Sequence, residues 1–569
     1  MENLKSYFII LSLLFIIFSC QKDELSTEGN IMKGSLGYEP EGLIELGDKI
    51  EDPYKIGNMR KALISLQESG KTNLKSSGAI DIQPTHLYIR FLPQTLEQLE
   101  LLRGDTALNL FGHPLDYEIR EGGSYYLDPN LPEGALTSYY GSIPVEAELP
   151  KAPYELIYEC YIPDTRKKDR HLKSTDAGEL TLLLEEEAFK ITGNLDFTAN
   201  ESPGKAQLKA SWEYPKGTFR VSDHTSGEWD GVSRVRIKIW RLTNTTQVWT
   251  DEGGNYESDK SFKYSPNYKM HFESRDGFKI WGNWAFVNEA TYDMGQHANT
   301  GLSRDIARNS GAWKWCTVNN AIQRYHDHCG FYGISRPPSD LRVWVFEKDD
   351  GTSSGSSAML RRTWGLYGFN TASKLNTFFN YMTGINFALT LLANLTSLVQ
   401  PDITVSVYSD NAESDDVYNT VFHECGHASH WVKAGSEYWV KYINYIITYG
   451  SLDNSYGNGT GLNAGYCGVA EMWGYYAGAL FERQEFINFS PYNTTVFGNT
   501  WSWFDEEEDW YNPGFLKDVD NITDVTTAEI FDCLRSNVYT INNLVSTLKT
   551  KTENGTQVDN AYAKYTDWP

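Results

Sequence analysis

The side chains best suited to metal chemistry lie in one stretch, His423-Glu424-Cys425-Gly426-His427. On a helix, residues four apart differ by about 400° of rotation, so His423 and His427 share a face and can offer two imidazole nitrogens to one cation. Glu424 lies beside that face without joining the ligands. Two nitrogen ligands with a neighbouring carboxylate suit Zn²⁺ and a base that takes a proton from water. The stretch therefore predicts a metal-assisted hydrolytic site.

The residues around this stretch favour a helix. Ser414-Asp415-Asp416 supplies an N-cap and an acidic first turn, and Ala434-Gly435 supplies a stop. Apolar residues recur at helical spacing between them: Val417, Val421, Phe422, Cys425 and Ala428. A buried helix with no role in chemistry is the alternative.

A third metal ligand has to come from elsewhere in the chain. An extended HExxHxxGxxH pattern is excluded because His430 and Lys433 occupy the places of its glycine and last histidine. Glu471 is the favoured ligand: it is the one acid in a small, apolar and aromatic helical run, and a buried carboxylate is costly unless it is paired or metal-bound. Glu437 is the rival, although its polar position at the start of a second helix, about residues 437–449, also suits a capping acid.

With Glu471 placed 44 residues after His427 (471 − 427 = 44), the pattern resembles the gluzincin metallopeptidases. That resemblance implies a zinc site with His423, His427 and Glu471 as ligands and Glu424 as general base. The thermolysin branch of this family has an Asp four residues after the ligand Glu, where this chain has Tyr475. Tyr475 is instead our candidate for stabilising the oxyanion, with Tyr476 and Tyr539 as alternatives. His430 is expected to be a packed or solvated histidine.

The resemblance implies a zinc-dependent metallopeptidase that hydrolyses peptide bonds of extracellular proteins or glycoproteins. The alternative is a non-catalytic surface lipoprotein that binds glycan or protein on the same scaffold. Aromatic residues make up 14% of the chain, and exposed ones could stack on sugars. An intact base beside the ligands favours the enzyme, because a pure binder has no need of it.

The N-terminus has the pattern of an export signal. Lys5 precedes an apolar run of about eleven residues, 8–18, which is too short to span a bilayer. The run ends at Ser19-Cys20 and so resembles a bacterial lipobox, with Cys20 as the lipidated residue. Gln21-Lys22-Asp23-Glu24 resembles the surface-export tag of Bacteroidota-type lipoproteins. An outer-membrane lipoprotein exposed at the cell surface is expected; an ordinary cleaved secretory signal is the alternative.

Charge and length limit the other possibilities. A formal net charge of −25 argues against nucleic acid, whose phosphates would be repelled. At 569 residues the chain should form two to four domains. Besides Cys20 there are six cysteines, for which core packing is expected; a Cys316–Cys329 disulfide stays open. The sequence does not fix the oligomeric state.

The expected architecture is multidomain. A small α+β domain is followed by a β-sandwich domain and by a mainly helical α+β zincin-like metallopeptidase domain. Residues 232–272 resemble the carboxypeptidase-regulatory or prealbumin-like β-sandwich. The expected divisions are signal peptide 1–20, tether 21–80, α+β domain 81–165, β-sandwich 176–275 and metallopeptidase domain 279–569.

Within the last domain, the expected order of elements is that of a zincin core. A helix over 307–329, a strand over 341–346 and an edge strand over 353–359 come first. A helix over 375–399 and a strand over 401–408 then lead into the metal helix. An extended peptide could pair with the edge strand through its backbone.

Overall fold

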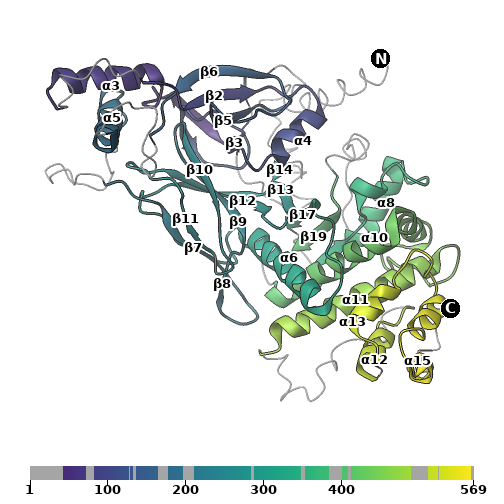
Figure 1. The fold of residues 1–569 in the computed structure, drawn as a ribbon. Helices are drawn as coiled ribbons and strands as arrows, with labels where there is room; N and C mark the ends of the chain where they lie inside the picture. The colour runs from purple at the N-terminus through teal and green to yellow at the C-terminus, as the bar shows by residue number, and fades with distance from the viewer. Residues whose placement is uncertain are drawn as a thin grey trace.

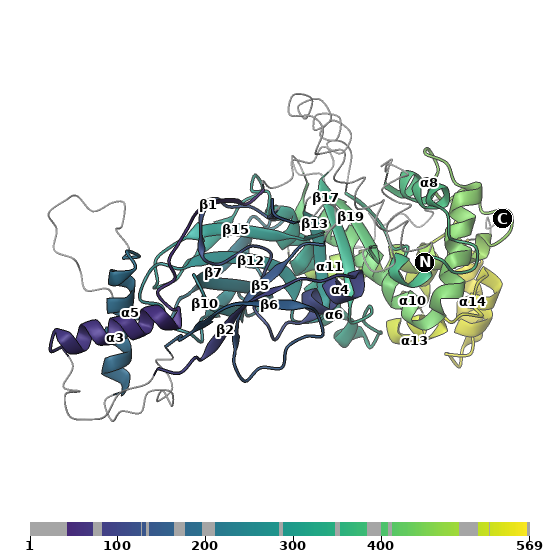
Figure 2. The same ribbon diagram turned by 90° about the horizontal axis from the view of Figure 1, so that it is seen from above.

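The computed structural model has three regions: an N-terminal α/β region, a sheet-rich middle and a helical C-terminal region. Figure 1 shows the N-terminal region over the central sheet, with the C-terminal helices gathered to one side. Figure 2 shows helices α3 and α5 at the end opposite to those C-terminal helices. The structure describes residues 43–71, 82–126, 128–131, 136–163, 177–195, 211–283, 288–347, 353–383, 400–407, 412–488, 510–522 and 524–565.

The N-terminal region is built on a four-stranded sheet in the order β3-β5-β2-β6, with a separate β1–β4 pair. Helices α3 and α5 pack against each other. Thr95 is the N-cap of α4, and its side chain accepts a hydrogen bond from the Gln98 amide. The elements are β1 (Glu45–Lys49), α3 (Ile56–Glu68), β2 (His86–Phe91), α4 (Leu96–Gly104), β3 (Leu110–Phe111), β4 (Tyr117–Glu121), β5 (Tyr139–Pro144), β6 (Tyr154–Cys160) and α5 (Ala177–Ile191).

Two sequence-based predictions for this region are wrong. Residues 43–71 do not form a tether: β1 pairs with β4, and Met59 and Leu63 of α3 are buried in the N-terminal core. Helix α5 replaces the β structure expected from residue 177. Leu180, Leu184 and Ala188 recur every four residues and are all buried, which is the spacing of a helix face. The signal peptide and Cys20 lie outside the described residues.

The middle region contributes to a nine-stranded sheet with the order β10-β9-β12-β13-β17-β19-β18, to which β14 and β15 also pair. A separate sheet contains β11, β7, β16 and β8. The strands are β7 (Lys216–Ser222), β8 (Trp229–Gly231), β9 (Val235–Arg241), β10 (Asn244–Trp249), β11 (Asn255–Glu257), β12 (Asn267–Ser274), β13 (Phe278–Asn283), β14 (Asn288–Glu289), β15 (Thr291–Gln296), β16 (Arg304–Ile306), β17 (Leu341–Glu347), β18 (Ser354–Ser356) and β19 (Ile403–Val407).

Within the described residues of the range 176–275, a self-contained β-sandwich is therefore not found. Strand β12 pairs with β13, and β13 runs parallel to β17, so the large sheet crosses the expected boundary. The largest apolar core likewise runs from Phe219 to Tyr565 and is shared by the middle and C-terminal regions. Apolar and charged residues alternate along β9, but alternation does not reveal how far a sheet extends.

The two faces of this sheet carry different side chains. On β9, Val235, Ile237 and Ile239 are fully buried in the main core. The alternate residues Arg236 and Lys238 face the N-terminal region and are also buried, at 4% and 3% exposure. A strand face that carries charged side chains is ordinarily exposed to solvent, so its burial under the N-terminal region is unusual.

The C-terminal helices pack on the apolar side of the sheet. Trp315 of α6 contacts the ring of Phe272 on β12, and the Tyr325 hydroxyl of α6 lies 2.9 Å from Ser429 Oγ of α10. The sheet thus positions α6, and α6 positions α10. The helices are α6 (Trp313–Tyr332), α7 (Leu360–Thr363), α8 (Ala372–Thr383), α10 (Ser414–Tyr449), α11 (Ala464–Phe486), α12 (Gly514–Ile522), α13 (Thr527–Cys533), α14 (Ile541–Leu548) and α15 (Gly555–Tyr562).

Most expected elements near the site are present. Strands β17 and β19 and helix α6 correspond to predicted elements, and α10 is broken at Gly435 (φ 81°), where a helix stop was predicted. The predicted helix over 375–399 is seen as α8, and its part from residue 384 lies outside the described residues. Among the described residues, no helix has both the length and the apolar character needed to cross a membrane.

The six described cysteines are buried free thiols. Cys316 and Cys329 both lie on α6, thirteen residues apart (329 − 316 = 13). Thirteen residues rise about 20 Å along a helix, whereas a disulfide needs Cα atoms within about 7 Å. The bridge left open by the sequence is therefore excluded.

A buried carboxyl in the N-terminal region makes stability depend on pH. Glu185 of α5 is 1% exposed; the Tyr54 hydroxyl donates to its Oε1 at 2.6 Å, and its Oε2 has no partner among the described residues. Burial is the main cause that raises the pKa of Glu185 to about 8, from an ordinary 4.5. Between these values the folded state keeps a proton that the unfolded chain has released, so this contribution to stability falls as pH rises and is lost above about pH 8.

We expect Glu185→Gln to raise the melting temperature at pH 8.5 and to change it little at pH 5. The amide keeps the shape and the neutral state, and it removes a charge that costs on the order of a few kcal/mol. Thermal unfolding at both pH values measures the difference, with the exposed Glu257→Gln as the matched control. An equal change at both pH values would contradict the assignment.

Candidate metal centre

Helices α10 and α11 approach closely because small residues line their contact. A Cβ atom at Gly426 would lie 3.4 Å from the Cβ of Ala477, and one at Gly478 would lie 3.4 Å from the Cβ of His423. Trp473 Nε1 donates a hydrogen bond to the Gly426 carbonyl at 3.0 Å, which ties the two helices together. This close crossing brings the side chains of both helices to one point.

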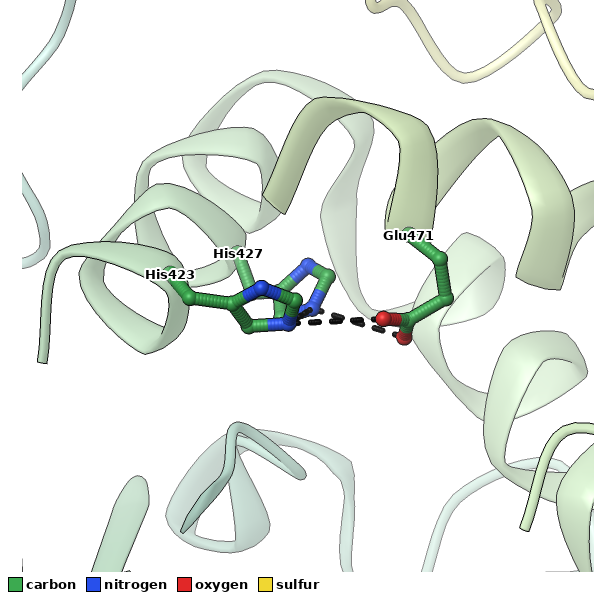
Figure 3. Close-up of side chains that lie close together, drawn as sticks. All are labelled: His423, His427 and Glu471. Atoms are coloured by element: carbon green, nitrogen blue, oxygen red, sulfur yellow. Dashed lines mark hydrogen bonds and ion pairs between the residues drawn. The ribbon is translucent and has the colours of Figure 1, made fainter. Parts of the chain in front are cut away.

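His423, His427 and Glu471 meet at that point. Figure 3 shows both imidazoles of α10 directed at the carboxylate of α11. The two Nε2 atoms lie 2.9 Å apart, and Glu471 oxygens lie 3.3 Å from His423 Nε2 and 3.4 Å from His427 Nε2. All three residues are buried, and their ligand atoms lie within 4.8 Å of one another. This buried group could hold a metal ion.

Glu471 is held by a residue that the sequence did not single out. The Tyr442 hydroxyl, on the second half of α10, donates to Glu471 Oε1 at 2.8 Å. Burial would raise the pKa of Glu471, but the charge and hydrogen bonds of the two histidines outweigh it and hold the pKa well below its ordinary value. Glu471 is thus an oriented anion. His427 Nδ1, in contrast, is buried without a hydrogen-bond partner among the described residues.

Glu424 lies beside this group, under the edge of the sheet. It is 4% exposed, and its Oε2 has no hydrogen-bond partner within the described parts of the chain. A Cβ atom at Gly355 of β18 would lie only 2.6 Å from Glu424 Cγ, so the glycine makes room for the carboxyl. Burial, and then the charge of Glu471, raises the pKa of Glu424 well above its ordinary value. A cation at the three ligands would offset that shift.

Gly474 is a second residue that sequence reasoning missed. It lies three residues after Glu471 on α11, facing the imidazoles. A Cβ atom there would lie 2.7 Å from His427 Cε1 and 2.9 Å from His423 Cε1. The signal in the sequence was a glycine inside a helix, where it costs roughly 1 kcal/mol relative to alanine and so indicates a packing or functional reason.

We expect Gly474→Ala to weaken metal binding by at least about tenfold, because the added methyl group must displace both rings from the ligand geometry. Helix propensity alone would make the substitution stabilising. Equilibrium dialysis with Zn²⁺ measures the loss. Gly57→Ala on α3, where a Cβ atom meets nothing within 4 Å, is the control. Unchanged affinity would show that the rings adjust freely.

The other predicted residues are placed apart from the metal group or at its rim. The Tyr475 ring lies 4.6 Å from the His423 ring, edge to face, and so borders the site. The Tyr476 hydroxyl lies 3.5 Å from Thr527 Oγ1. Tyr539 stacks on Tyr466. His430 is fully buried against Tyr438 and Trp439, as a packed histidine.

The rival ligand Glu437 does not join the group. Its carboxylate is 58% exposed and pairs with Lys441 at 2.9 Å, in the i, i+4 geometry of a surface ion pair. Glu471, in contrast, is completely buried.

No protein-family model matches this chain, and no curated protein matches it.

Proposed function

We propose that this chain is a zinc-dependent metallopeptidase that hydrolyses peptide bonds of extracellular proteins or glycoproteins. The observation that carries the proposal is the convergence of His423, His427 and Glu471, with the unpaired carboxyl of Glu424 beside them. An arrangement used only for metal binding has no need of a fourth, unpartnered acid. Burying such a group is costly, and a role in proton transfer explains why the fold keeps it.

The donor set fits zinc. Two imidazole nitrogens and one carboxylate, all on protein helices, are a common set of ligands for catalytic Zn²⁺, whereas Mg²⁺ and Ca²⁺ prefer oxygen. The burial of all three ligands suits this set, because the charge of Glu471 then has a partner. When bound, Zn²⁺ supplies Lewis-acid chemistry by lowering the pKa of water and polarising a carbonyl.

Glu424 is assigned the proton transfers. It would accept a proton from the attacking water and deliver it to the nitrogen of the leaving amine, acting first as base and then as acid. Its burial excludes bulk water from this exchange, and the glycine at position 355 lets the carboxyl lie against the strand where a substrate could dock. Tyr475, at the rim beside His423, is the candidate donor to the oxyanion.

Strand β18 is the proposed docking edge for substrate. Among the described strands it pairs only with β19, in antiparallel register, and it ends the path of the large sheet. Ser354 and Ser356 bond through their hydroxyls to Ser406 and Thr404 of β19, which fixes the strand. An extended peptide could add to its free side by backbone hydrogen bonds, with the scissile bond near Glu424.

We also propose that the chain is exported and anchored in the outer membrane through a lipid on Cys20. The support is the pattern of residues 5–24, which lie outside the described part of the structure. Labelling cells with a fatty-acid analogue tests this, since Cys20→Ala should lose the label. A label that persists in that variant would refute the anchor.

The deciding experiment for the activity is mass-spectrometric detection of new peptide termini. Residues 21–569 would be incubated with a panel of plain and heavily glycosylated proteins, with and without chelator, beside Glu424→Gln. New termini made only by the unchelated wild type would support the peptidase. If wild type and Glu424→Gln, each with one zinc bound, gave no new termini on the whole panel, a binding role would be favoured.

A further inference from the structure

The buried charged face of the central sheet lies against the N-terminal region. Arg236 and Lys238 of β9 and Lys269 of β12 all point from the sheet to this side, and each is at most 4% exposed. Lys238 Nζ donates to the Leu110 carbonyl, and Lys269 Nζ donates to the Gly123 carbonyl at 2.8 Å. Burying several cations between two packed layers is costly unless each one has an anion beside it.

A cavity of about 90 Å³ lies between the two layers. One water molecule needs a cavity of roughly 10–15 Å³, so this cavity has room for several waters or one small ion. Four cationic residues line it against two acids, Asp105 and Glu289; the cations are Arg103, Arg236, Lys238 and Lys269. The lining therefore has an excess of positive charge.

Most of these cations have an acidic partner. Arg236 pairs with Glu273, Lys269 pairs with Asp293 at 3.1 Å, and Arg103 pairs with Glu100 at 3.3 Å. Lys238 differs: among the described residues no carboxylate lies within 4.0 Å of its Nζ, whose contacts are the Leu110 carbonyl and the face of Phe111. Arg236 Nε is also buried and without an acceptor in the described part of the chain. One buried donor without an acceptor, Arg236 Nε, and one buried cation without a contacting carboxylate, Lys238, thus lie at one cavity.

The energetic consequence is consistent with a missing anion. Burial, and then the positive charge of Arg236, lowers the pKa of Lys238 well below its ordinary value. An apolar side chain at this position would not carry the cost of burying a charge. Glu289 and Glu273 attract the Lys238 charge without contacting it, and they offset only part of this effect. A small anion in the cavity would supply a contacting partner.

We propose that this cavity binds one small oxyanion, a carboxylate or a phosphate, held by Lys238 Nζ and Arg236 Nε. The site lies between the N-terminal region and the sheet and uses none of the metal-centre residues. It would be a ligand site separate from the hydrolytic chemistry, and its occupant would help to fasten the N-terminal region to the sheet.

Isothermal titration of the full chain tests this proposal with two probes, inorganic phosphate and acetate, each at the same ionic strength set with sodium chloride. The protein carries His423→Ala and is treated with chelator, so that an anion held by a metal cannot contribute. We expect one site per chain for at least one probe, and the stronger probe identifies the anion class. Lys238→Met should weaken binding by at least tenfold, whereas the exposed Lys216→Met should not change it.

Arg236→Lys is a second variant, which keeps the charge beside Glu273 and removes the Nε donor; we expect it to weaken binding severalfold. Circular dichroism would show that each variant is folded. Lys238→Met should be at least as resistant to heat as the parent in chloride, because it removes a buried charge. No saturable binding of either probe by the parent, or equal affinity in the parent and in the folded variants at 236 and 238, would overturn the proposal.

Discussion

Glu424→Gln is expected to lower peptide-bond hydrolysis by about 10²–10⁴-fold while leaving metal content unchanged. The amide has the size of the carboxyl and fits the space beside Gly355, but it cannot accept a proton from water. His423, His427 and Glu471 are untouched, so the proposed ligand set stays complete. The loss should therefore appear in kcat, with metal still bound at one equivalent per chain.

The matched control is Glu437→Gln, which makes the same substitution on the same helix. Glu437 is exposed and pairs with Lys441, so its loss should leave both turnover and metal unchanged. Metal content would be measured by elemental mass spectrometry and turnover with a peptide identified from the proteomic panel. Equal turnover in wild type and Glu424→Gln would remove Glu424 from the proton transfers.

Replacing Glu471 is expected to have the largest effect on metal binding. Glu471→Ala removes one of the three proposed ligands. The loss of Zn²⁺ affinity should therefore exceed the roughly 10–100-fold loss that is typical when a residue that only supports a ligand is removed. Competition with a chromogenic chelator measures the affinity. Glu471→Gln keeps the volume and an acceptor for the Tyr442 hydroxyl, so it separates loss of the ligand charge from damage to the helix contact.

Glu437→Ala is the control for this experiment as well. If Glu471→Ala bound zinc normally and Glu437→Ala lost it, Glu437 and not Glu471 would be the third ligand. Loss in both would indicate that the second half of α10 has moved, which near-ultraviolet circular dichroism of its tyrosines and tryptophans would show.

The histidine pair was predictable because its geometry is local: the 423/427 spacing on one helix fixes a shared face whatever surrounds it. Glu471 was predictable from its surroundings in the sequence, since an acid among small and aromatic residues needs a partner. The supporting residues were not predictable. Tyr442 reaches Glu471 from another helix, and Gly355 and Gly474 matter only because side chains from α10 lie against them.

In the fold, too, features set by local sequence were predictable and features set by distant contacts were not. The strands and the break at Gly435 follow from local patterns, but how many strands share a sheet depends on distant pairings. The alternation on β9 produces one apolar and one charged face, and the sequence contains nothing that says a second layer covers the charged one. Residues 56–68 were assigned to a tether because the packing partner of α3, helix α5, lies more than a hundred residues away and was itself expected to be β structure.

The short hairpin between β12 and β13 makes the middle and C-terminal regions inseparable. A fusion or truncation placed between Ser274 and Phe278 would leave an unpaired strand edge on each half, and such edges promote aggregation. The helices that carry His423, His427 and Glu471 therefore cannot be transplanted as a module without the strands that precede them. Recombination during evolution would have faced the same restriction, so these two regions are expected to be inherited together.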